Sequence, residues 1–91
     1  MDLKQLQNDL VTLRRIERLL KLSIFTEKDV MRLLSLAEMG IPRAEYLYGV
    51  YAFSYLKNTD LTNQWFSKCK SHANGYYLLK IAMFYLTKGN Q

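Results

Sequence analysis

The residues that could do chemistry are sparse in this 91-residue chain, and the two that lie closest together are Cys69 and His72. On a helix, a spacing of three residues places both side chains on one face, where they could share a metal ion or act as nucleophile and base. A structural zinc site needs four ligands, and the sequence holds no second cysteine or histidine. Cys69 also continues an apolar helical face, so we interpret it as a small core residue. We expect no metal site, no cofactor and no enzymatic activity.

A basic cluster on the first predicted helix is the second candidate site, formed by Arg14, Arg15, Arg18 and Lys21. Three of these residues lie in one line along a helix and could follow a phosphate backbone. Glu17 lies within the cluster, and further acidic residues flank it in the sequence. We therefore favour a solvated charged face, with contact to an anion or nucleic acid as the alternative.

Tyrosine provides the third candidate site, because all seven tyrosines fall in two segments of the chain. Within residues 44–56, helical spacing puts Tyr48, Tyr51 and Tyr55 on one stripe. Tyrosine is enriched at binding hot spots, and it is equally common at the edge of a core with its hydroxyl in water. The stripe is therefore either the middle of the core or the floor of a groove that contacts a partner protein.

The elements that must position these residues are predicted to be helices. Apolar residues recur every three or four positions, and period-2 alternation is almost absent, which predicts an all-α fold of about five helices in one domain. The segment 44–56 is apolar on nearly all sides, so it needs neighbours on more than one side. The expected helices span residues 2–22, 26–40, 42–57, 61–73 and 76–88, and the domain spans 1–91.

Residues 1–22 form an amphipathic helix that we expect to dock on the hairpins of residues 26–89. Its leucine stripe includes Leu6, Leu10 and Leu13, which are candidates for contact with a partner protein or with a second copy in a homodimer.

Four residues predict where helices begin and end. Thr26 is expected to cap the second helix and Gly40 to end it, while Pro42 starts the third. Asp60 is expected to cap the fourth.

The overall composition indicates a soluble protein. The net charge is +5, and the basic excess lies in the second half, where five lysines face Asp60 alone. The longest uncharged run, residues 46–56, is too short to span a membrane. The first residues lack the apolar run of a signal peptide, and one cysteine excludes an internal disulfide. We expect a cytoplasmic protein.

The stretch LAEMGIPRAEYLYGVY at residues 36–51 resembles the Sel1-like repeat, a relative of the tetratricopeptide repeat. Ala37, Gly40, Ala44 and Gly49 match the small residues of that pattern. The resemblance covers roughly residues 27–89. It departs from the pattern at LKNTD, which replaces the glycine-containing loop between paired helices, and at Cys69-Lys70, where alanines are usual.

The resemblance implies antiparallel helical hairpins stacked as a short α-solenoid, with a concave protein-binding face and no chemistry. We therefore expect a non-enzymatic adaptor or chaperone-like protein that binds another protein through an apolar, tyrosine-rich helical surface. Two alternatives remain open. One is a small basic regulator that binds nucleic acid, and the other is a phage- or plasmid-encoded inhibitor of a host protein complex.

Overall fold

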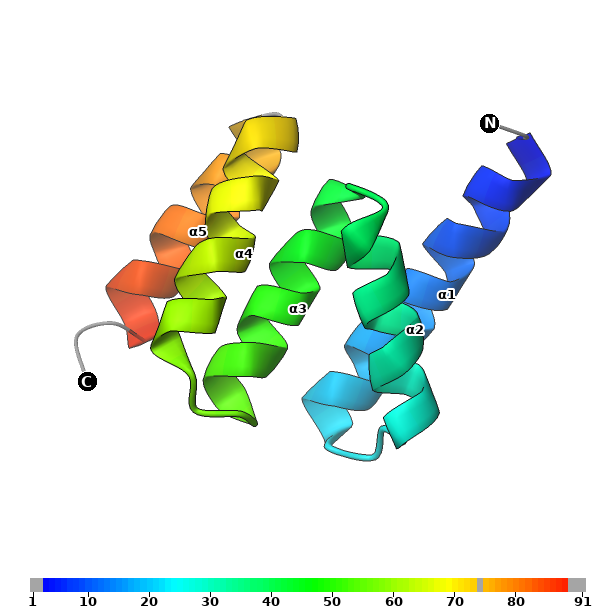
Figure 1. The fold of residues 1–91 in the computed structure, drawn as a ribbon, viewed down its shortest axis with the longest axis horizontal. Coiled ribbons are helices and arrows are strands. Elements are labelled where there is room, and N and C mark those ends of the chain that lie inside the picture. Colours follow the sequence, from blue (N-terminus) through cyan, green and yellow to red (C-terminus); the bar gives the residue numbers. More distant parts are fainter. Residues whose placement is uncertain (1–2, 74, 89–91) are drawn as a thin grey trace.

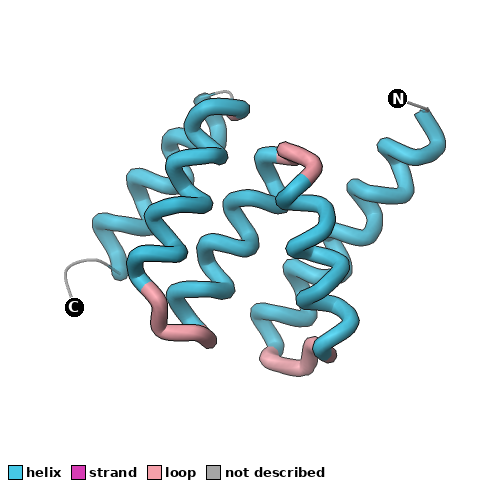
Figure 2. The backbone as a smooth tube through the Cα atoms, viewed as in Figure 1, coloured by secondary structure: helices cyan, strands magenta, loops and turns pink. Residues whose placement is uncertain are grey.

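Five helices and no strand make up the part of the chain that the computed structural model describes, residues 3–73 and 75–88 (Figure 1). This confirms the all-α class and the arrangement as helical hairpins. The helices are α1 (Leu3–Leu22), α2 (Glu27–Glu38), α3 (Pro42–Ser54), α4 (Thr59–His72) and α5 (Gly75–Lys88). Short loops join the first four, so that successive helices run antiparallel (Figure 2).

Helix α3 is the centre of the fold, because it contacts each of the other four helices. Helices α1, α3 and α5 run in the same direction, with α2 and α4 returning between them (Figure 1). In that view α2 and α4 lie in front, and α1 and α5 lie behind.

Two apolar clusters lie on opposite sides of α3, as expected for a helix that is apolar nearly all round. In the first cluster, α3 packs against α1, α2 and Trp65 of α4. In the second cluster, the other side of α3 packs against α4 and α5 around Phe66 and Phe84. The buried members of the first cluster are Leu13, Ile16, Leu20, Leu33, Leu36, Ala37, Ala44, Leu47, Tyr48 and Trp65. Those of the second are Phe66, Cys69, Ile81 and Phe84.

Small residues on α3 allow α4 to approach closely. A Cβ atom added at Gly49 would lie 2.5 Å from the ring of Phe66, far inside van der Waals contact. Ala44 and Ala52 are fully buried on the same helix. The absence of a side chain at Gly49 thus permits the close packing of α4 on α3.

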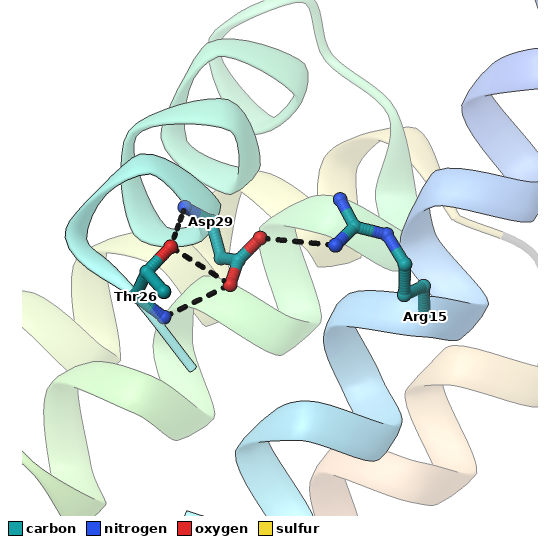
Figure 3. Close-up of polar contacts among 3 residues, drawn as sticks. All are labelled: Arg15, Thr26 and Asp29. Atoms are coloured by element: carbon teal, nitrogen blue, oxygen red, sulfur yellow. Dashed lines mark hydrogen bonds and ion pairs between the residues drawn. The ribbon is translucent and has the colours of Figure 1, made fainter. Parts of the chain in front are cut away.

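The beginning of α2 is fixed by a capping box between Thr26 and Asp29 (Figure 3). The Thr26 hydroxyl accepts the N–H of Asp29 at 3.3 Å, and the Thr26 N–H donates to the Asp29 carboxylate at 2.9 Å. That backbone N–H is the main reason why the pKa of Asp29 lies below its usual value, and Arg15 lowers it further. Thr26 is confirmed as the cap, Pro42 begins α3, and Gly40 follows α2 with a φ of +83°.

The turn between α3 and α4 differs from the prediction. Asn58 caps α4, since its side-chain oxygen accepts the N–H of Leu61 at 3.0 Å, so Asp60 already lies in the first turn. Helix α3 ends at Ser54, before Lys57, because Lys57 takes the left-handed conformation with a φ of +54°.

Helix α1 is longer than the helix it packs against. Its 20 residues span about 30 Å, whereas the 12 residues of α2 span about 18 Å. Leu3 near its beginning is exposed. Leu10 is exposed for another reason: its neighbour Asp9 is buried and pairs with Arg32 of α2, so Leu10 lies off the buried face that carries Asp9 and Leu13. Within the described residues, no helix combines the length and apolar character that a membrane crossing requires.

Candidate protein-binding groove

A hollow of about 480 Å³ lies between α1 and α5, and α3 forms its floor. Its apolar surface comes mainly from Leu20 of α1, Val50 and Tyr51 of α3, and Phe84 of α5. Lys21 and Lys88 stand on the two walls. The complete lining consists of Leu20, Lys21, Val50, Tyr51, Ser54, Tyr55, Phe84 and Lys88.

Two smaller hollows extend this space along α3. One, of about 340 Å³, shares Lys21 with the first, and it is lined by Arg14, Glu17, Arg18, Lys21 and Arg43. The other, of about 110 Å³, shares Glu17 and Arg43 with the second, and it is lined by Glu17, Arg43, Tyr46, Leu47, Tyr76, Tyr77 and Lys80. Neighbouring hollows share lining residues, and we call the three together the inner groove.

The tyrosines at the wide end of the groove are held in place by α1 and by Phe25. The Tyr55 hydroxyl donates to the carbonyl of Leu20 at 2.8 Å and lies 2.7 Å from the hydroxyl of Ser23. The same carbonyl, in the last turn of α1, also accepts the N–H of Ser23 at 3.2 Å. The ring of Tyr51 stacks on that of Tyr55, with centroids 5.7 Å apart. Phe25 meets the edges of both rings, so the groove floor is preorganised.

The narrow end of the groove is held by an ion pair. Arg43 of α3 donates to Glu17 of α1 at 2.7 Å, and both side chains are largely buried. The ammonium of Lys80 lies 5.1 Å from the ring centre of Tyr46, a cation–π contact between α5 and α3. Burial raises the pKa of Tyr46 and of Tyr77, so both hydroxyls stay protonated at neutral pH.

The groove is strongly positive. Glu17 is its one acidic lining residue, and Arg43 neutralises it. The basic lining residues are Arg14, Arg18, Lys21, Arg43, Lys80 and Lys88.

The predicted tyrosine stripe is divided between core and groove. Tyr48 is only 8% exposed and packs against Trp65, with ring centres 5.5 Å apart, so it belongs to the core. Tyr51 is half-buried and Tyr55 is 38% exposed, and both line the groove.

Two of the leucines proposed from sequence for partner contact, Leu10 and Leu13, do not line the groove. Leu13 is fully buried in the first cluster. Leu10 is 41% exposed near the free end of α1. The side chain of Leu6 lies outside the described residues.

The predicted basic cluster is also divided. Arg14, Arg18 and Lys21 line the groove, and within the described residues no ion pair neutralises them. Arg15 instead reaches α2 and pairs with Asp29 at 3.3 Å (Figure 3).

Several groove residues were not found from the sequence, namely Leu20, Arg43, Val50, Lys80, Phe84 and Lys88. They come from three helices that are not consecutive, so no local pattern joins them. The sequence could have indicated these residues only through the common direction of the first, third and fifth helices, because helices that run in parallel bring residues at equivalent positions together.

Cys69 and His72 do not form a reactive pair. The Cys69 thiol is fully buried and donates to the carbonyl of Pro42 at 3.4 Å, and burial raises its pKa to about 11. His72 Nδ1 lies 3.0 Å from the buried carboxylate of Glu45. Among the described residues, no group of three or more His, Cys, Asp or Glu side chains could hold a metal ion.

Comparison of the chain with protein-family models, curated proteins and solved structures gives no match. The functional argument therefore rests on the geometry of the inner groove.

Proposed function

We propose that this protein is a non-enzymatic protein-binding module, an adaptor or chaperone-like protein, that holds a helix of a partner protein in the inner groove. One observation carries the proposal. The hollow of about 480 Å³ lies between two parallel helices, and its floor leaves Val50 and Tyr51 half-buried and Tyr55 38% exposed.

The shape of the groove supports a helical occupant. Among the described residues α1 and α5 make no contact with each other, although both pack on α3, so the face of α3 between them is open to a further helix. Packed helices lie about 8–10 Å apart. Laying an amphipathic helix into an apolar groove is a common mode of peptide recognition. Tyrosine and arginine, which both line this groove, are the residues that most often carry binding energy.

We propose no catalytic role, because neither of the two candidate reactive residues, Cys69 and His72, is free to react. The Cys69 thiol stays protonated and buried, and His72 is engaged by Glu45. The relationship to Sel1-like repeats is part of the same proposal, supported by the hairpin arrangement and by the close contact at Gly49. A cytoplasmic location is likewise proposed, in keeping with the single cysteine.

Site-specific crosslinking tests the proposal. A photoreactive amino acid at Ser54 would project from the groove lining, and the same group at Lys28 on α2 serves as the matched control. We expect a crosslinked partner from Ser54 and none from Lys28, in cells of the native host. The crosslink should disappear in a Tyr51→Ala variant that remains folded by circular dichroism. Equal crosslinking from both positions, or none from Ser54, would contradict a binding role for the groove.

A further inference from the structure

We infer that the occupant of the inner groove is an amphipathic helix with acidic residues on both sides of its apolar stripe. This inference rests on the proposed function, because it names the chemistry of the partner at the same site. It depends on the distribution of charge around the groove.

The α1 wall of the groove carries a line of positive charge. Arg14, Arg18 and Lys21 have the spacing i, i+4 and i+7, so they follow the axis of α1 over about 10 Å. A partner helix beside α1 that repeats this spacing with glutamate or aspartate would place one carboxylate opposite each cation. Glu17 does not offset this line, because its carboxylate already binds Arg43 at 2.7 Å.

The α5 wall is positive as well. Lys88 lines the wide hollow opposite Lys21, and Lys80 lines the narrow end. Helix α5 contains no acidic residue at all. A helix in the groove is therefore flanked by cations on both sides, and a partner with lysine or arginine at its flanks would be repelled.

The floor between these walls is apolar. Val50, Tyr51 and Tyr55 present the accessible aliphatic and aromatic surface, above the buried Leu20 and Phe84. Burial of a partner's leucine or phenylalanine there supplies the affinity that exposed ion pairs alone do not. This floor favours a helix over nucleic acid, whose phosphates gain nothing from apolar surface. Arg15 is also withdrawn from the positive line by Asp29.

Three synthetic peptides would test the inference. They share one apolar stripe with the spacing i, i+3, i+4 and i+7, and they carry glutamate, glutamine or lysine at the flanking positions. Binding is measured by fluorescence anisotropy at about 50 mM and about 300 mM salt, where screening differs strongly. NMR amide shifts of the protein locate each peptide.

We expect the glutamate peptide to bind about tenfold more tightly than the glutamine peptide, as three or four exposed ion pairs would give, and the lysine peptide to bind most weakly. The advantage of the glutamate peptide should shrink at the higher salt concentration. Lys21→Glu should also reduce it, whereas Lys28→Glu on α2, outside the groove, should leave it unchanged.

The outcomes distinguish failure of the acidic-partner inference from failure of the groove proposal. If the glutamine peptide shifts groove amides but glutamate brings no gain, the acidic partner is overturned and the groove proposal stands. If no peptide shifts groove amides, the groove proposal itself fails. If duplex DNA binds more tightly than the glutamate peptide, with an affinity that falls steeply with salt and on Lys21→Glu, the groove recognises nucleic acid and the inference is overturned.

Discussion

The two sides of α3 are held by different interactions. On the side of α1 and α2, aliphatic side chains form the core, and three ion pairs join the helices: Arg15–Asp29, Arg32–Asp9 and Arg43–Glu17. On the side of α5, the contacts are mainly between aromatic rings, and no ion pair between described residues involves α5, although His72 of α4 contacts Glu45 of α3. Charge pairs tolerate small displacements, but edge-to-face rings in a close-packed core do not. The free energy of unfolding should therefore depend on side-chain shape on the α5 side, and on pH and helix capping on the α1 side.

The largest expected effect is on the α5 side, at Gly49. In Gly49→Ala the new methyl group would meet the ring of Phe66, which is fully buried and cannot move aside. Overpacking should outweigh the better helix propensity of alanine and lower the free energy of unfolding by about 2 kcal/mol. Urea denaturation measures the change. Gly75→Ala is the matched control, because a Cβ there meets nothing within 4 Å. Equal losses of stability at both glycines would show that the clash with Phe66 is not the cause.

On the α1 side the largest expected effect is the loss of the cap at Thr26. Thr26→Ala removes the side-chain oxygen that accepts the N–H of Asp29 and should cost about 1 kcal/mol. Thermal unfolding followed by circular dichroism would detect it. Thr26→Ser keeps the oxygen and should retain most of the stability, so a loss as large as that of the alanine variant would argue against capping.

A smaller effect is expected from pH at Asp29. Its pKa is lower in the folded protein than the reference value of 3.8, so below about pH 4 the unfolded chain takes up a proton first. The contribution of Asp29 is therefore present above that pH and is lost as the pH falls through the folded pKa. Urea midpoints at about pH 6 and about pH 3 should differ less in Asp29→Asn than in the wild type. Identical pH dependence in the two proteins would show that the folded environment does not lower this pKa.

The smallest effect is expected in the turn between the two sides, at Lys57. Its left-handed φ of +54° strains a residue with a side chain but not a glycine. Lys57→Gly should raise the free energy of unfolding by about 0.5 kcal/mol after the entropy cost of glycine in the unfolded chain. Differential scanning calorimetry would show a small rise in Tm. A fall in Tm would mean that the Lys57 side chain stabilises the fold by more than its left-handed backbone destabilises it.

The helices could be predicted because periodicity and capping depend on residues that are close in the sequence. The remaining features depend on packing between residues that are far apart in the sequence. Thr26, Gly40 and Pro42 act within a few residues, so their roles followed from the sequence. Asn58 was missed in favour of Asp60 because both are good caps, and only the backbone of the turn distinguishes them.

The groove was predictable only in part, for a geometric reason. Helical spacing placed Tyr48 and Tyr55 on one stripe, but Tyr48 lies within α3 against Trp65 and is buried, whereas Tyr55 follows the last residue of α3 and is exposed. Lys88 and Phe84 are contributed by a helix that reaches the groove only because α5 runs parallel to α1.

The missing methyl group at Gly49 has a consequence for the placement of α5. Phe66 contacts Gly49 on one side, and its ring also meets Phe84 and Tyr85 of α5. The depth to which this ring sinks into α3 thus sets how closely α5 packs against α3. A single hydrogen atom in place of a side chain at Gly49 lets α4 and α5 settle together on α3, and any larger residue there would push both helices outward.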